Sequence, residues 1–217
     1  MKANTMIHEM RRDYRRGDLD LGDLAPSPID QFLTWFEDAR AVESETEANA
    51  MTVATVGSDG RPTARVVLLK GVDASGFRFF TSYLSRKASD IVANPFAALV
   101  FFWPHLERQV RIEGRIQKTS AADSEAYFRT RPIGSQVSSL LSRQSSPLAD
   151  RDAFERAFAE GVSAAERDPI TFDPDRWGGY LVIPDRFEFW QGRPSRLHDR
   201  FSYTLTNDVW NIERLYP

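Results

Sequence analysis

The sequence predicts a mostly β protein, an antiparallel barrel with helices packed on its outside. Two observations favour this fold. Short runs rich in Val, Leu and Phe follow one another through tight turns, and the chain shows no strand–helix–strand alternation. A doubly wound parallel sheet would require that alternation. The length of 217 residues is enough for one domain with a substantial core.

The N-terminal part divides into an arm and a helix. Residues 1–24 are charged and poorly periodic, so we expect a mobile arm that precedes a single domain over residues 25–217. The run Ser27–Asp30 then supplies an N-cap, a first-turn proline and a capping-box acid. Apolar residues at helical spacing extend the predicted helix to about Glu43; they are Ile29, Phe32, Leu33 and Phe36.

The later elements follow from changes of hydrophobic period and from turn residues. The predicted strands are Met51–Val56, Thr63–Lys70, Phe77–Ser82, Phe96–Trp103, Arg108–Lys118, Tyr180–Ile183, Arg186–Trp190, Arg196–Leu205 and Val209–Leu215. Further helices are predicted over Ser85–Ala93, from the Ser120/Asp123 capping pattern to Pro132, and over Asp150–Arg167. Pro184 separates two of the strands, and the last two form a hairpin over residues 206–208.

Composition excludes several classes of protein. Acidic residues outnumber basic ones by 31 to 28, so binding of a polyanion through bulk charge is not expected. The absence of cysteine excludes disulfides, cysteine-ligated metals and a thiol nucleophile. His8, His105 and His198 show no metal-ligand spacing, and no metal site is expected. Without an apolar run long enough for a membrane span, or an export signal, we expect a cytoplasmic enzyme or binding protein.

Two groups of cations suggest anionic ligands. Arg86 and Lys87 follow Ser85 at the start of a predicted helix, where cations are unfavourable unless an anion binds. The alternative is a pair of solvated surface side chains. On the predicted strand after Arg196, alternate residues share a face, which would group Arg196, His198 and Arg200. Such a face suits a flat anionic ligand or, alternatively, open water.

Two further groups are weaker signals. Tyr127 and Arg131 are four residues apart on a predicted helix, and a turn after Pro132 could bring Ser135 alongside them. A phenol, a guanidinium and a hydroxyl together can bind phosphate, although such pairs are also common on helix surfaces. The strand Arg65–Lys70 is apolar inside and cationic at both ends, which favours a buried strand whose end charges reach water.

These motifs, in this order, resemble the pyridoxine (pyridoxamine) 5′-phosphate oxidase family over nearly the whole chain from about residue 10. Within the resemblance, Val137–Leu141 departs from the family pattern of small residues and a tryptophan. The matching motifs are Arg-Val-Val-Leu-Leu-Lys at 65–70, Phe-Phe-Thr-Ser at 79–82, Ser-Arg-Lys at 85–87, Arg-Gln-Val-Arg-Ile-Glu-Gly at 108–114, Arg-Pro-Ile-Gly-Ser-Gln at 131–136, Ser-Arg-Gln-Ser at 142–145, Trp-Gly-Gly-Tyr at 177–180 and Glu-Phe-Trp-Gln-Gly-Arg-Pro-Ser-Arg-Leu-His-Asp-Arg at 188–200.

The resemblance implies a split β-barrel homodimer that holds FMN at the subunit interface. It assigns to FMN the residues Arg65, Val66, Val67, Leu68, Leu69, Lys70, Phe80, Thr81, Arg86, Lys87, Gln109, Gln144, Ser145, Trp190 and Arg200, with Arg86 and Lys87 at the FMN phosphate. It assigns to the substrate phosphate the residues Lys70, Tyr127, Arg131 and Ser135. Arg196 and His198, the implied catalytic residues, would flank the substrate ring with Leu197 between them. Arg11 and Tyr14 would close over the substrate, which makes the arm a lid.

The reaction so implied oxidises C4′ of pyridoxine 5′-phosphate or pyridoxamine 5′-phosphate with O2, yielding pyridoxal 5′-phosphate and H2O2, and ammonia from the amine. Because the flavin carries the difficult chemistry, the lack of a paired acid and base in the sequence is expected. One alternative is a related FMN oxidase that acts on another ring, as in phenazine biosynthesis. A second is a non-catalytic protein that binds FMN or pyridoxal phosphate.

Overall fold

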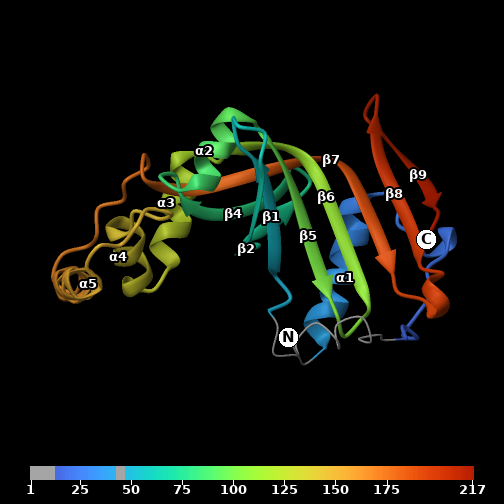
Figure 1. Cartoon of the computed structure of the whole chain (residues 1–217), viewed down its shortest axis with the longest axis horizontal. Coiled ribbons are helices and arrows are strands. Elements are labelled where there is room, and N and C mark those ends of the chain that lie inside the picture. Colours follow the sequence, from blue (N-terminus) through green and yellow to red (C-terminus); the bar gives the residue numbers. More distant parts are fainter. Residues whose placement is uncertain (1–12, 43–46) are drawn as a thin grey trace, which may run out of the picture. The chain divides into compact units, whose positions relative to one another are not determined.

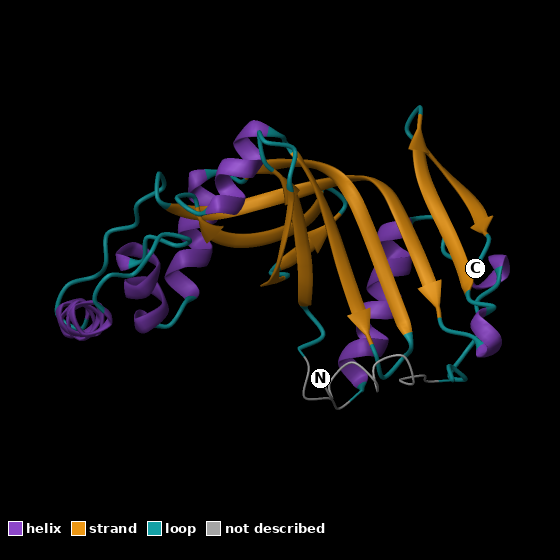
Figure 2. Ribbon diagram, in the orientation of Figure 1, coloured by secondary structure: helices purple, strands orange, loops and turns teal. Residues whose placement is uncertain are grey.

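The computed structural model describes residues 13–42 and 47–217, and most of its regular structure is strand (Figures 1 and 2). The strands run in the sheet order β2-β1-β5-β6-β7-β4-β3, with β8 pairing with β7 and β9 with β8. The β1–β2, β4–β7 and β7–β8 ladders are antiparallel, which confirms the predicted class of fold. The strands are β1 (Ala50–Val56), β2 (Pro62–Leu68), β3 (Gly71–Asp73), β4 (Gly76–Ser82), β5 (Phe96–Trp103), β6 (Arg108–Lys118), β7 (Trp177–Gln191), β8 (Asp199–Thr206) and β9 (Val209–Leu215).

Two helices begin where the sequence places a serine cap. Ser27 Oγ accepts a hydrogen bond from the Asp30 N–H, and Ser120 Oγ accepts one from the Asp123 N–H, as predicted. No helix in the described ranges is long and apolar enough to cross a membrane. The α-helices are α1 (Pro28–Ala41), α2 (Arg86–Ala93), α3 (Ala121–Thr130), α4 (Ile133–Leu141) and α5 (Arg151–Ala165), and short 3₁₀ turns cover Leu21–Asp23 and Pro194–Arg196.

The chain divides into two compact units. Unit 1 comprises the described residues up to Ala48 together with Val100–Ile112 and Asp185–Pro217. In this unit α1 lies against the strands (Figure 1), and its aromatic side chains contact those of β5 and β7. The Phe32 ring lies 4.9 Å from that of Phe101, and the Trp35 ring lies 5.3 Å from that of Phe189. Complete burial of one such ring stabilises the fold by about 1.5–3 kcal/mol.

Unit 2 comprises Asn49–Leu99 and Glu113–Pro184. Its core contains Phe77, Phe79 and Val182, which are all fully buried. Helices α4 and α5 approach each other at Gly161, where an added Cβ would lie only 2.8 Å from Val137 Cγ1. Glycine there allows the two helices to pack closely.

The structure corrects the prediction of two strands around Pro184. Strand β7 runs without a break from Trp177 to Gln191. Its ladder with β4 ends at Val182, and its ladder with β8 begins at Arg186. Pro184 therefore lies in the stretch of β7 that pairs with neither β4 nor β8.

The strand predicted over Arg196–Leu205 begins only at Asp199. Arg196 belongs to the 3₁₀ turn, where Ser195 and Arg196 have φ values of 55° and 62°. The predicted strand face that joins Arg196, His198 and Arg200 is therefore wrong. A non-glycine residue with positive φ cannot continue a strand, and the side-chain alternation ends there.

Three smaller differences concern unit 2. Helix α4 replaces the turn predicted after Pro132, and the short strand β3 lies between two of the predicted strands. Strand β2 was expected to be buried, but it lies at the end of the sheet with β1 as its partner. Val66 on that strand is 68% exposed.

Candidate functional site

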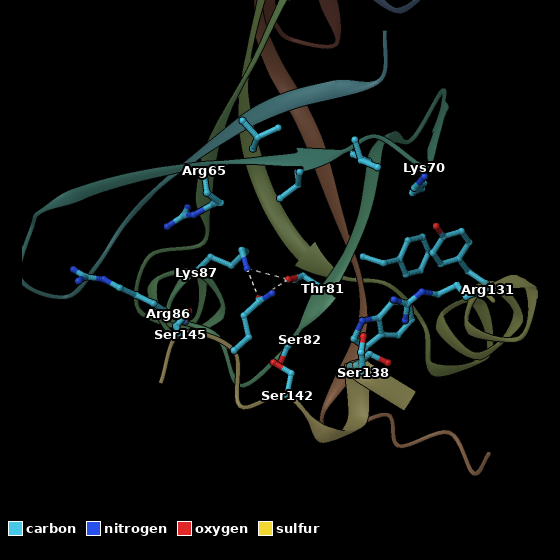
Figure 3. A pocket seen from close by; sticks show the side chains of 18 residues that line it. Arg65, Lys70, Thr81, Ser82, Arg86, Lys87, Arg131, Ser138, Ser142 and Ser145 are labelled. Carbon is cyan, nitrogen blue, oxygen red and sulfur yellow. Dashed lines mark hydrogen bonds between the residues drawn. The ribbon is translucent and has the colours of Figure 1, made fainter. Parts of the chain in front are cut away.

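Unit 2 contains a pocket of about 700 Å³, a size typical of small-ligand sites (Figure 3). Strands β2 and β4 and helices α2, α3 and α4 supply most of its walls. The lining residues are Arg65, Val66, Val67, Leu68, Lys70, Phe80, Thr81, Ser82, Arg86, Lys87, Tyr127, Arg131, Ser138, Ser139, Ser142, Gln144, Ser145 and Trp177.

A buried carboxylate organises the cations at one end of the pocket. Asp90, whose side chain is 6% exposed, accepts hydrogen bonds from the hydroxyls of Thr55 at 2.7 Å and Thr63 at 2.8 Å. The Arg65 guanidinium donates to the same two hydroxyls and lies 3.8 Å from Asp90, while Arg86 lies 4.0 Å from it. Burial raises the pKa of Asp90, but these hydrogen bonds and cations outweigh it and hold the pKa below its usual value.

Lys87 is a buried cation beside this cluster. Its Nζ donates to Thr81 Oγ1 at 3.0 Å, to Ser85 Oγ at 3.3 Å and to Gln144 Oε1 at 2.6 Å; Figure 3 draws the bond to Thr81. Burial, followed by the charge of Arg65, lowers the pKa of Lys87 to about 8. With its three protons already directed at protein oxygens, Lys87 contributes positive charge and orients the Gln144 amide.

The start of α2 is open to an anion. The Ser85 hydroxyl donates to Ser82 O and does not cap the helix, and the first turn carries no acidic residue. The cluster carries a net charge of 3 − 1 = +2, since it contains the three cations Arg65, Arg86 and Lys87 and the one carboxylate of Asp90. Two positive charges at a helix N-terminus match a phosphate dianion.

The other end of the pocket is aromatic and contains a second cationic group. The rings of Phe80 and Tyr127 stack 4.0 Å apart, and Trp177 stacks on Phe80 at 5.5 Å. The Arg131 guanidinium lies 4.5 Å from the Trp177 ring centroid. Its Nη1 is buried and has no hydrogen-bond partner among the described residues. A buried donor without a partner is costly, and an anion in the pocket would satisfy it.

Unit 1 contains an aromatic cluster around His198. The Trp190 and Tyr14 ring centroids lie 4.6 Å and 5.8 Å from that of His198, and Tyr14 meets Trp190 edge-on at 5.6 Å. The Arg193 backbone N–H donates to His198 Nδ1 at 3.0 Å. Burial and the charge of Arg196 lower the pKa of His198. We therefore assign a neutral imidazole that carries its proton on Nε2.

Arg200 in the same unit is held by an acid. Its Nε donates to Glu188 Oε1 at 3.0 Å, and its Nη1 donates to the Tyr216 carbonyl. Glu188 also accepts from Arg111 at 3.1 Å. Arg200 thus belongs to an ion-pair network on β6, β7 and β8.

The residues expected to bind FMN or substrate fall into two groups. The pocket of unit 2 brings together Arg65, Val66, Val67, Leu68, Lys70, Phe80, Thr81, Arg86, Lys87, Tyr127, Arg131, Gln144 and Ser145. Leu69 and Ser135 are in unit 2 but do not line this pocket, and Leu69 is buried. Unit 1 contains Tyr14, Gln109, Trp190, Arg196, Leu197, His198 and Arg200, while Arg11 lies outside the described residues.

The sequence reasoning missed five lining residues: Ser82, Ser138, Ser139, Ser142 and Trp177. Ser138 and Ser139 come from α4, the helix that was not predicted. The apolar spacing of Ile133, Val137, Leu140 and Leu141 is a helical signal that would have placed them.

Comparisons with known proteins identify the family. Residues 38–163 match the sequence profile described as pyridoxamine 5′-phosphate oxidase, and residues 177–217 match the C-terminal dimerisation region of pyridoxine 5′-phosphate oxidase. A pyridoxine/pyridoxamine 5′-phosphate oxidase of Burkholderia multivorans is 52% identical over 98% of this chain and 100% of its own length. The enzyme of the same name from Pseudomonas syringae pv. tomato is 51% identical over 97% of this chain and 98% of its own length.

The chain belongs to the pyridoxamine 5′-phosphate oxidase family.

Solved structures agree on the fold. PhzG from Burkholderia lata, in complex with tetrahydrophenazine-1-carboxylic acid, superposes with a TM-score of 0.85 at 27% identity over 93% of this chain and 100% of that one. An FMN-binding protein from Nostoc punctiforme, related to pyridoxamine 5′-phosphate oxidase, superposes with a TM-score of 0.68 at 20% identity over 89% and 100%. The expected split-barrel fold is thereby confirmed.

Family membership assigns FMN as the cofactor, as expected from the sequence. The residues of the unit 2 pocket fit this group, because a cluster of charge +2 at a helix start suits the FMN phosphate and the stacked aromatic wall suits a planar ring. The match of residues 177–217 to a dimerisation region indicates a homodimer.

Proposed function

We propose that this oxidase converts pyridoxine 5′-phosphate or pyridoxamine 5′-phosphate to pyridoxal 5′-phosphate, with O2 as the acceptor. The observation that carries the proposal is the buried, partnerless Nη1 of Arg131 in a pocket that also contains Lys70. Together with the Tyr127 phenol, Lys70 and Arg131 form a second anion site, made of other residues than the cluster around Asp90. FMN and a phosphorylated substrate together carry two phosphates, so the presence of two cationic groups in the pocket supports the proposal.

The proposed roles follow this division. Arg86 and Lys87, with Arg65 held by Asp90, neutralise the FMN phosphate, and Gln144 and Ser145 contribute hydrogen bonds. Lys70, Tyr127 and Arg131 hold the substrate phosphate. For Ser135, which does not line the pocket, the resemblance alone supports the same role.

When bound, FMN supplies a hydride acceptor at its N5 and is reoxidised by O2. The substrate loses a hydride from C4′ and a proton from its oxygen or nitrogen, O2 becomes H2O2, and water releases ammonia from the amine. The protein contributes orientation, since holding two reactants in register lowers the barrier without acid–base chemistry. His198, neutral with its proton on Nε2, donates a hydrogen bond to the substrate, and the Arg196 guanidinium covers the pyridine ring.

The remaining proposed contacts rest on the family resemblance. They assign Gln109, Trp190 and Arg200 to FMN and place FMN at the interface of the homodimer. Residues 1–24, with Arg11 and Tyr14, then act as a lid on the single domain formed by residues 25–217.

A second candidate is oxidation of a phenazine precursor, which the TM-score of 0.85 to PhzG favours. The ligand in that structure carries a carboxylate and no phosphate. A site built for it would need less positive charge than Lys70 and Arg131 provide.

The experiment compares kcat/KM for pyridoxine 5′-phosphate, pyridoxamine 5′-phosphate, unphosphorylated pyridoxine and a reduced phenazine carboxylate, with H2O2 as the common readout. We expect kcat/KM for the two phosphorylated substrates to exceed that for the two unphosphorylated ones by at least about a hundredfold. This factor corresponds to the loss of two charge-assisted hydrogen bonds to the phosphate. Preference for the phenazine carboxylate would refute the proposal in favour of the second candidate.

A further inference from the structure

Residues 13–20, here called the N-terminal segment, have few buried side chains and little backbone pairing with other elements. Tyr14 is half-buried and Leu19 is buried, while the rest of the segment is exposed. Among the described residues, no backbone–backbone hydrogen bond joins residues 13–19 to another element. Apart from the burial of Leu19, neither strand pairing nor a core holds these described residues in place.

Two carboxylates of unit 1 hold this backbone. Glu107 Oε2 accepts hydrogen bonds from the successive N–H groups of Arg15 at 2.7 Å and Arg16 at 2.9 Å. Farther along, Asp199 Oδ2 accepts from the Leu19 N–H at 3.1 Å. Consecutive amides that converge on one anion form a strong, directional contact.

Glu107 is itself rigidly held. The residue is 2% exposed and ends the turn between β5 and β6, with a φ of 56°. Its carbonyl accepts hydrogen bonds from the Gly192 N–H at 2.7 Å and from Gln191 Nε2 at 3.3 Å. The backbone that carries this carboxylate is therefore fixed with respect to the end of β7.

The anchored amides directly follow Tyr14, which reaches the aromatic cluster around His198. Tyr14 also lies on Gly192, where an added Cβ would lie 2.7 Å from Tyr14 Cγ. The absence of a side chain at Gly192 leaves room for the ring. The contacts of Tyr14 with Trp190, Gly192 and His198 thus depend on where the Arg15 and Arg16 amides are held.

We propose that Glu107 is a positioning residue for substrate binding: its carboxylate clamps the Arg15 and Arg16 amides and so places Tyr14 against His198. This inference rests on the proposed function, in which Tyr14 and His198 contact the substrate. Glu107 acts through Tyr14 and touches neither substrate nor FMN.

Trypsin reports the clamp directly, because it cleaves after Arg15 and Arg16 when their backbone is free to adapt. Limited digestion of the FMN-loaded protein, followed by mass spectrometry, gives the cleavage rates of the 15–16 and 16–17 bonds. We expect Glu107→Ala to raise both rates at least about tenfold, through loss of two charge-assisted hydrogen bonds. Glu107→Gln, whose amide oxygen can accept the same bonds, should restore most of the protection. Asp38→Ala, which removes the partner of the adjacent Arg108, should leave both rates unchanged.

A double-mutant cycle tests the route through Tyr14. Glu107→Ala and Tyr14→Ala should each raise KM for pyridoxine 5′-phosphate about tenfold, and the double variant should be no worse than either. The dissociation constant for FMN, from quenching of flavin fluorescence, should stay at the wild-type value in all three. Gly192→Ala keeps the N–H that donates to the Glu107 carbonyl but displaces the Tyr14 ring, and it should raise KM similarly.

Wild-type cleavage rates in Glu107→Ala would overturn the clamp, and multiplicative effects on KM would overturn the route through Tyr14. If the wild-type protein turns over neither B6 phosphate, the proposed function fails, whereas the digestion still tests the clamp by itself.

Discussion

Replacing Arg131 by alanine tests the assignment of the substrate phosphate. The guanidinium lies 4.5 Å from the Trp177 ring centroid, and its buried Nη1 has no partner among the described residues. In the complex, that nitrogen would donate a hydrogen bond to a phosphate oxygen. Hydrogen bonds to charged groups contribute about 1.5–3 kcal/mol, and each 1.4 kcal/mol is about tenfold in affinity. KM for pyridoxine 5′-phosphate should therefore rise roughly 10- to 150-fold.

The assay is H2O2 release at varied concentrations of pyridoxine 5′-phosphate and of unphosphorylated pyridoxine. In Arg131→Ala the preference for the phosphorylated substrate should shrink by the same factor as KM rises, with little change in kcat. Arg131→Lys keeps the charge but loses the planar fork, and an intermediate KM is expected.

Arg129→Ala is the matched control. Arg129 lies in the last turn of α3, two residues before Arg131, but it pairs with Glu125 at 2.8 Å and does not line the pocket. Its removal should leave KM within about twofold of wild type, as for most exposed ion pairs. A KM for Arg131→Ala equal to that of this control would show that Arg131 does not bind the substrate phosphate.

Three further predictions concern FMN, turnover and stability. Burial lowers the pKa of Lys87 to about 8, and a bound phosphate would raise it, so FMN binding should weaken as pH rises above about 8. Flavin fluorescence titrations should show this slope in the wild type, and a Lys87→Met variant that retained it would refute the assignment. Arg196→Ala should lower kcat far more than FMN content; a parallel loss of flavin, measured by absorbance, would mean that Arg196 serves the cofactor instead. Asp90→Ala removes the acceptor of Thr55 and Thr63 and the buried partner of Arg65, and should lower the free energy of unfolding of the apoprotein by roughly 3 kcal/mol. Urea titration measures this, and a loss no larger than that of the exposed Asp38→Ala would contradict it.

Local signals in the sequence predicted most of the fold. The caps at Ser27 and Ser120 fixed the starts of α1 and α3, and the position of Arg86 and Lys87 at the start of α2 pointed to an anion. Each of these signals depends on residues within one turn of one another. For that reason they can be recognised in the sequence without knowledge of the tertiary structure.

The parts that were missed depend on distant partners. Proline usually interrupts a strand, whereas Pro184 lies within β7, in the gap between its β4 and β8 ladders. The positive φ values at Ser195 and Arg196 have no compositional marker, since neither residue is glycine. Asp90, in α2, was not singled out either, because its role follows from Thr55 on β1 and Thr63 on β2.

Oxidation of a B6 phosphate by the flavin of this protein is tested most directly by anaerobic mixing of the purified FMN-loaded protein with pyridoxine 5′-phosphate or pyridoxamine 5′-phosphate, followed by air. We expect the visible flavin absorbance to bleach with substrate and to recover with O2, and pyridoxal 5′-phosphate to accumulate. A yellow protein that bleaches with neither substrate would mean that these B6 phosphates are not its substrates.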